Sequence, residues 1–139
     1  MPSKKTVKRA QKDLRQGKRP STAAGEFVRE EFDHIRQGKH GARSTKQAIA
    51  IGLSKARRAG VPLAPPKRGT VSEKTRKSAE RAYQEGQGIR APHPPSPRRS
   101  RASLNTLKHE GTAAASRRAI SNQARGSAAR KHRRQRTAM

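Results

Sequence analysis

The chain has no cysteine and no tryptophan, and its 139 residues include only two phenylalanines and one tyrosine. Without cysteine the protein has no disulfide and no thiolate metal cluster, which is typical of a reducing compartment. No apolar run approaches the roughly 20 residues that span a bilayer, and no apolar segment follows the basic start as in a secretory signal. From these absences we expect a soluble, cytoplasmic protein.

Acidic residues are also scarce, because nine Asp and Glu face 35 Lys and Arg, for a net charge of +26. Such a chain repels itself at neutral pH until an anion neutralises it. Phosphate polymers are the commonest such anion in a cell, and each neutralised phosphate releases condensed salt ions, which favours binding. The composition therefore predicts a nucleic acid as the partner, with no membrane and no small-molecule substrate.

Large apolar side chains are few and lie mainly between residues 21 and 63. High charge with so little apolar surface is typical of disorder, because burial cannot offset the entropy of the chain. We predict a mostly α fold, in which a small αα-hairpin core and a further short helix carry long basic arms that are largely disordered.

Residues 21–61 are predicted to form the αα-hairpin. Ser21, which follows Pro20, is expected to cap a first helix that runs to about Gln37 and ends at Gly38. Apolar residues recur along one side of this helix, namely Ala24, Phe27, Val28, Phe32 and Ile35.

The second hairpin helix has clear signals at both ends. Ser44 and Gln47 form a capping box, and Gly60 stands where a left-handed cap ends a helix. Small residues recur every four positions and would let another helix approach closely, so we also expect a homodimer through this face. The face consists of Ala48, Gly52 and Ala56.

Two of the flanks carry weaker helix signals. Val7, Ala10 and Leu14 make a thin apolar stripe on a cationic segment, which we expect to be helical when bound. Thr70 and Glu73 form another capping box, which opens a third helix that leans on the hairpin or stands alone. The flanks divide into a basic arm at 1–20, a Pro-rich linker at 62–69, the third helix at 70–86, and a Pro/Arg-rich tail at 87–139 that is disordered or helical on binding.

The residue types of a catalytic or metal site are present but scattered. We expect Asp13 and the acids of the first hairpin helix to lie on a solvated surface, with none placed opposite another in an apolar pocket that would shift its pKa. Glu30 and His34 share a helix face and His40 follows, but scattered ligands without a fourth are typical of an ordinary surface. We therefore predict no enzyme, no metal and no cofactor.

The connection between the hairpin helices, residues 38–44, is basic and contains glycine. It opens onto a helix N-terminus, whose free N–H groups favour an anion such as a backbone phosphate. Alternatively, it only caps and connects the two helices. It is also longer than the turn of a helix–turn–helix motif, which disfavours sequence-specific reading.

Both phenylalanines are needed for a core, which leaves Tyr83 as the one aromatic free to stack on a base. This favours contact with the phosphates of a duplex. With about eight cations engaged, binding should fall with salt at a log–log slope near −7. The predicted phosphate contacts are Lys4, Lys5, Lys8, Arg9, Lys12, Arg15, Arg43, Lys46, Lys55, Arg57, Arg58, Arg130, Lys131, Arg133, Arg134 and Arg136.

The stretches GEFVREE at 25–31 and STKQAIAIGLSKAR at 44–57 resemble a group of small basic bacterial proteins that are labelled DNA-binding or plasmid-stabilisation proteins, or are uncharacterised. The resemblance covers the hairpin of about 40 residues. It implies a bacterial, cytoplasmic, DNA-associated role and brings no catalytic residues with it.

The leading prediction is a nucleoid-associated or plasmid-maintenance protein that binds duplex DNA through backbone phosphates with little sequence specificity. The first alternative is an RNA-binding, ribosome-associated protein, because RNA offers the same phosphates. The second is a protein-interaction module that uses the acidic stretch at residues 26–33.

Overall fold

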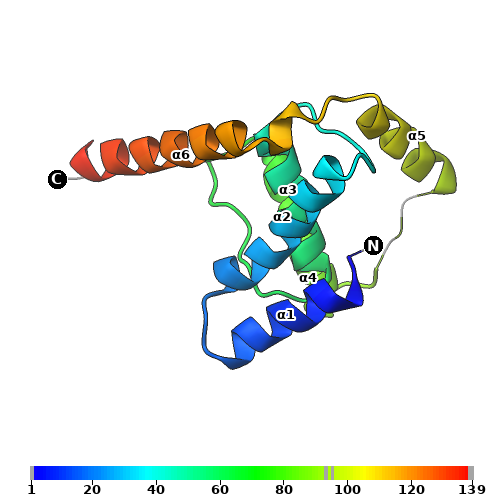
Figure 1. Ribbon diagram of the computed structural model, residues 1–139. Coiled ribbons are helices and arrows are strands. Elements are labelled where there is room, and N and C mark those ends of the chain that lie inside the picture. The colour runs from blue at the N-terminus through cyan, green and yellow to red at the C-terminus, as the bar shows by residue number, and fades with distance from the viewer. Residues whose placement is uncertain (1, 93, 95, 138–139) are drawn as a thin grey trace.

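The computed structural model describes residues 2–92, 94 and 96–137, and these form six α-helices and one 3-10 turn, with no β-strand among them (Figure 1). The predicted mostly α class is confirmed. The parts of the predicted arm and tail at residues 1, 93, 95 and 138–139 lie outside the described residues. Within the described ranges, no helix has both the length and the apolar character to cross a bilayer. The elements are α1 (Lys4–Arg15), α2 (Pro20–Arg36), α3 (Thr45–Arg58), α4 (Glu73–Gly86), α5 (Pro97–Lys108), η1 (Ala113–Ala115) and α6 (Arg117–Thr137).

The helices α2 and α3 pack against each other as the central pair (Figure 1). The small-residue face of α3, with Ala48, Gly52 and Ala56, is buried. A Cβ built on Gly52 would lie 2.7 Å from the Cα of Val28, so this close approach requires glycine. The helix that packs closely against these small residues is therefore α2 of the same chain. A homodimer through this face, as expected from the sequence, would require α2 and α3 to separate.

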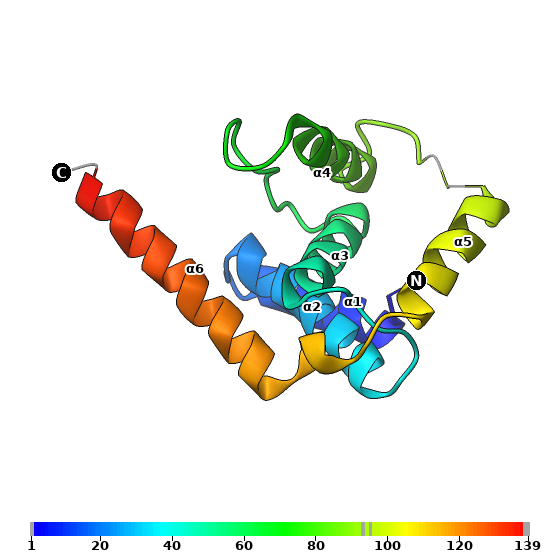
Figure 2. The same cartoon turned by 90° about the horizontal axis from the view of Figure 1, so that it is seen from above.

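The helix α1 packs across α2 and completes the first apolar cluster (Figure 2). Ala10 is buried together with Phe27, and Val7 and Leu14 pack against them. The thin stripe predicted in this segment is thus the contact surface of a docked helix. The predicted disorder of the N-terminal arm is not supported, because Phe27 gives α1 an apolar surface on which to fold.

Glycine ends several of the helices through the same backbone motif. At the end of α3, Gly60 has a φ of 101°, and the N–H of Val61 donates to the carbonyl of Ala56 at 3.1 Å. This is the predicted left-handed cap. The predicted end at Gly38 has the same form, with a φ of 75°, and so does Gly17 after α1, with a φ of 76°.

The predicted helix starts are less accurate. Ser44 caps α3, accepting from the N–H of Gln47 at 3.1 Å, but Gln47 accepts from the N–H of Arg43 in place of the Ser44 N–H. The caps predicted at Ser21 and Thr70 are wrong. In α2, Pro20 takes the first helical position, which leaves Ser21 inside the first turn. For α4 the capping residue is Ser72, two positions after Thr70.

The helix α4 packs against α3. Of the two predicted arrangements, this is the one in which the third helix leans on the hairpin and does not stand alone. Ala82 is buried, and Gln87 donates from its side chain to the carbonyl of Gly60 at 3.1 Å. Gly86 lies so close to the backbone of Arg57 that a side chain there would overlap it. These contacts hold the C-terminal ends of α3 and α4 against each other.

The C-terminal tail returns to the hairpin and does not remain separate from it. Ala114 and Ala115 of η1 are buried with Ile35, Ala42 and Ala48 in the second apolar cluster. The predicted disorder of the tail is not supported, because α5, η1 and α6 are ordered elements of the structure. The helix α6 then leads away from the body of the molecule (Figures 1 and 2).

Candidate nucleic-acid interface

The cations predicted in the first arm lie together on the outward face of α1. At 3.6 residues per turn, they occupy an arc of about 140°, opposite the side that packs on α2. The only acid of α1, Asp13, is buried and pairs with Lys18 at 3.3 Å, so it does not interrupt this face. We call this face the α1 cationic face, and its exposed members are Lys4, Lys5, Lys8, Arg9, Lys12 and Arg15.

The cations predicted in the tail lie on the last turns of α6, which extend beyond the other helices in both views (Figures 1 and 2). The helix contains no acidic residue. These side chains span an arc of about 220° around the helix, so they point in opposing directions. We call them the α6 cation set, and its exposed members are Arg130, Lys131, Arg133, Arg134 and Arg136.

The five cations predicted in the hairpin have different surroundings. Arg43, Lys46 and Arg58 are exposed. Arg57 is only 7% exposed, and its guanidinium donates to the carbonyls of residues 63 and 64 at 3.2 and 3.1 Å. Burial lowers the pKa of Arg57. Its role is to hold the Pro-rich linker against α3, so we do not count it among the phosphate contacts.

Lys55 is also engaged inside the protein, where its ammonium group pairs with Glu31. Glu31 is 1% exposed and occupies the same side of α2 as Phe27 and Ile35. The prediction that Asp13 and the α2 acids lie on a solvated surface is therefore wrong for Asp13 and Glu31. The signal for Glu31 was its position, four residues after Phe27 and four before Ile35, within the apolar stripe.

In the connection at residues 38–44, several backbone N–H groups already have partners within the chain. The N–H of Gly41 donates to the carbonyl of Leu107 at 2.8 Å, and that of Ala42 to the carbonyl of Gly111 at 3.1 Å. Ser44 already caps the helix that follows. These bonds occupy N–H groups that the expected phosphate site would use, so they favour the alternative, in which the residues cap and connect two helices.

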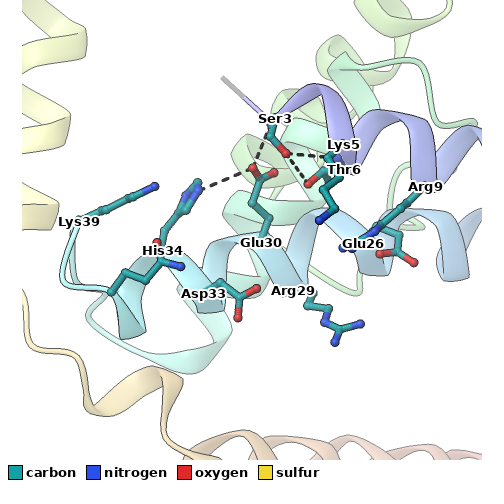
Figure 3. A pocket seen from close by; sticks show the side chains of 11 residues that line it. Ser3, Lys5, Thr6, Arg9, Glu26, Arg29, Glu30, Asp33, His34 and Lys39 are labelled. Carbon is teal, nitrogen blue, oxygen red and sulfur yellow. Dashed lines mark hydrogen bonds and ion pairs between the residues drawn. The ribbon is translucent and has the colours of Figure 1, made fainter.

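The acidic stretch of α2 lines a pocket of about 250 Å³ beneath α1 (Figure 3). The carboxylate of Glu30 accepts from the backbone N–H of Ser3 at 2.9 Å and lies 3.6 Å from His34. Burial alone would raise the pKa of Glu30, but the hydrogen bonds from Ser3 and Thr6 and the nearby His34 outweigh it and lower the pKa. Asp33 pairs with Arg36 at 3.8 Å. Most of this stretch is thus bonded within the chain.

Burial also lowers the pKa of His34, although Glu31 and Glu30 act in the opposite direction. His40 brings a second imidazole to the same place, with Nε2 at 3.2 Å from Glu31 Oε2. The sequence indicated Glu30 as the neighbour of His34, whereas the carboxylate that the two imidazoles share is Glu31.

Comparison with known proteins gives no matching family model, no similar curated protein and no similar solved structure. The resemblance of residues 25–31 and 44–57 to small basic bacterial proteins therefore remains a prediction.

Proposed function

We propose that the chain is a non-enzymatic DNA-binding protein of the nucleoid-associated or plasmid-maintenance type, and that it acts in the bacterial cytoplasm. It contacts backbone phosphates of a duplex with little sequence specificity. The observation that carries the proposal is the α6 cation set, which surrounds a projecting helix that has no acid of its own.

The distribution of acids supports an exposed cationic surface. Six of the nine acids pair with a cationic side chain or a histidine of the chain, so few remain to screen the Lys and Arg of α1 and α6. The excess charge is therefore directed at solvent, where it attracts a polyanion.

The shape of α6 suits the major groove of B-form DNA. The helix has 21 residues and is about 30 Å long. An α-helix fits a groove about 12 Å wide, and phosphates line both walls of that groove. Cations that point in opposing directions from one helix can reach both walls at once. The α1 cationic face, which points one way, suits contact with the outside of one strand.

Two features favour DNA over the alternatives. A-form RNA has a deep, narrow major groove that side chains do not read, so α6 has no equivalent site there. Single strands are bound by stacking on exposed aromatic side chains, but Phe27 is buried and Phe32 and Tyr83 are half-buried. The protein-interaction alternative has less support, because three of the four α2 acids, Glu30, Glu31 and Asp33, pair within the chain.

The test is a competition in which a random-sequence DNA duplex, an RNA duplex and single-stranded DNA are offered at one salt concentration. We expect the DNA duplex to be preferred. In a variant with the α6 cation set changed to Gln, affinity for DNA should fall at least about a hundredfold, because five phosphate contacts are lost. A matched variant changes five exposed cations elsewhere to Gln and should lose far less affinity; its positions are Lys67, Arg68, Lys74, Lys77 and Arg81.

Equal losses in the two variants would contradict the proposal, because they would mean that only total charge matters. A preference for RNA would replace it with the ribosome-associated alternative.

A further inference from the structure

Three potential metal ligands meet at the C-terminal end of α2. They are one carboxylate oxygen of Glu31 and one ring nitrogen each of His34 and His40, and these atoms all lie within 4.8 Å of one another. Glu31 and His34 are three residues apart on α2. His40 is brought back to them by the connection to α3, which the backbone hydrogen bonds from residues 41 and 42 to the tail hold in place.

Each imidazole has a partner at the nitrogen that faces away from the cluster, a hydrogen-bonded carbonyl for His40 and a nearby carboxylate for His34. His40 Nδ1 lies 2.8 Å from the carbonyl oxygen of Gly41, which only accepts, so Nδ1 carries the hydrogen. His34 Nε2 lies 3.6 Å from Glu30, while Nδ1 faces Glu31 at 4.0 Å. Metal-binding histidines in proteins are oriented in this way, by a carbonyl or a carboxylate on the other nitrogen.

One oxygen inside the cluster, Glu31 Oε2, has no hydrogen-bond partner among the described residues. In neutral His40 the lone pair of Nε2 faces Glu31 Oε2 at 3.2 Å, and two acceptors at this distance repel each other. Glu31 Oε2 is also buried. A cation between these atoms, either a proton or a metal ion, removes the conflict.

We propose that Glu31, His34 and His40 form a Zn²⁺ site. Two imidazole nitrogens and one carboxylate are a common set of three protein ligands for Zn²⁺, with water in the fourth position. The partly exposed side of His34 gives that water access. At the usual Zn–ligand distances the ligand atoms lie about 3.4 Å apart, so the side chains close in by about 1 Å on binding. The negative end of the α2 dipole also favours a cation here.

Lys55 is the internal competitor for this site, because its ammonium pairs with Glu31 Oε1, the carboxylate oxygen that His34 Nδ1 faces. Its side chain is 26% exposed, so it can turn to solvent when Zn²⁺ binds. Removing this ammonium should strengthen Zn²⁺ binding by at least about tenfold, since a positive charge beside the metal is lost. If the cluster were only an internal ion pair, the same change would leave metal affinity where it was.

The experiment is a calorimetric titration of Zn²⁺ into the full chain at neutral pH, with Co²⁺ absorption as a report on ligand geometry. We expect one Zn²⁺ per chain. Binding should weaken more than about a hundredfold in His34→Gln and His40→Gln, and about tenfold in Glu30→Gln, which changes the charged partner of His34 Nε2 but none of the three ligands. Lys55→Met should bind more tightly. The control is His109→Gln, because His109 is exposed on the C-cap of α5.

Zn²⁺ binding that is absent, or that survives both histidine substitutions, would overturn the site. In that case a proton lies between His40 and Glu31. Because His34 is partly exposed, His34→Gln decides the question even if His40→Gln disturbs the fold. DNA affinity is not a readout here, so the result is independent of the proposed function.

Discussion

The helices α1 and α6 are the two most cationic elements of the molecule, yet they are used differently. Val7, Ala10 and Leu14 dock α1 on Phe27, whereas Ile120 is the only bulky apolar residue of α6. The cations of α1 therefore lie on one face, opposite the docked side, whereas those of α6 are distributed around the helix. The comparison teaches that a few apolar side chains decide which part of a basic chain becomes scaffold and which part remains free to reach a polyanion.

The largest expected effect tests the apolar side of this comparison. Phe27→Ala should lower the free energy of unfolding by about 3 to 5 kcal/mol, because Phe27 is fully buried between α1 and the central pair. Ile120→Ala should cost under about 1 kcal/mol, because Ile120 is only half-buried. Urea denaturation followed by circular dichroism measures both. Similar losses would mean that α6 belongs to the folded core as much as α1 does.

The next effect tests whether α6 acts as a helix or only as a string of charges. Gly126 lies inside α6, and a Cβ built there would meet only the end of the Arg130 side chain, at 3.7 Å. Gly126→Pro should cost the helix about 3 kcal/mol relative to Ala and reduce DNA affinity about tenfold, although the charge is unchanged.

Gly126→Ala is the matched control, because it favours the helix and leaves the charge unchanged. It should bind DNA at least as tightly as the unmodified chain. Equal affinities for the Pro and Ala variants would show that the tail binds as an extended cationic chain, in the way that its composition alone predicts.

The smallest expected effect is a difference between α1 and α6 in their response to acid pH. Glu30 holds the N-terminus of α1 through Ser3, and its pKa is lowered in the folded protein. A carboxyl with a lowered pKa adds stability above its unfolded-state pKa, and this contribution is lost as the pH falls through the folded-state value. The docking of α1 should therefore weaken in acid, whereas α6 has no acid and should not respond.

Amide chemical shifts of α1 and α6, followed across an acid titration, measure this difference. Glu30→Gln should remove the part of the α1 response that comes from this carboxyl. An unchanged response in that variant would show that Glu30 is not the source of the acid sensitivity.

Local signals in the sequence predicted the central pair well. The cap at Ser44, the end at Gly60 and the small face around Gly52 are set by residues within a turn or two of each other, so they can be read from spacing alone. Ser21 and Thr70 have the right chemistry for caps but lose the position to a neighbour, since Pro20 and Ser72 fix where the helices begin.

The features that sequence reasoning missed depend on contacts between distant segments. The return of residues 107–115 to the hairpin is made by two backbone hydrogen bonds, two side-chain bonds to carbonyls and a pair of buried alanines, none of which leaves a periodic pattern. That return occupies the N–H groups of residues 41 and 42 and holds the connection that carries His40. Arg57 and Lys55 look like any surface cation in the sequence, and only the carbonyls and carboxylate that surround them show otherwise. The helix α5 has no buried residue and hence no apolar stripe to reveal it.

The central claim is that phosphates are bound by the exposed cations of α1 and α6, and the salt dependence of binding to a random-sequence DNA duplex tests it most directly. We predict a log–log slope near −7 for the unmodified chain, and a slope shallower by about 4 when the α6 cation set is changed to Gln. A slope that is shallow in the unmodified chain, or one that the α6 substitutions leave unchanged, would contradict the account.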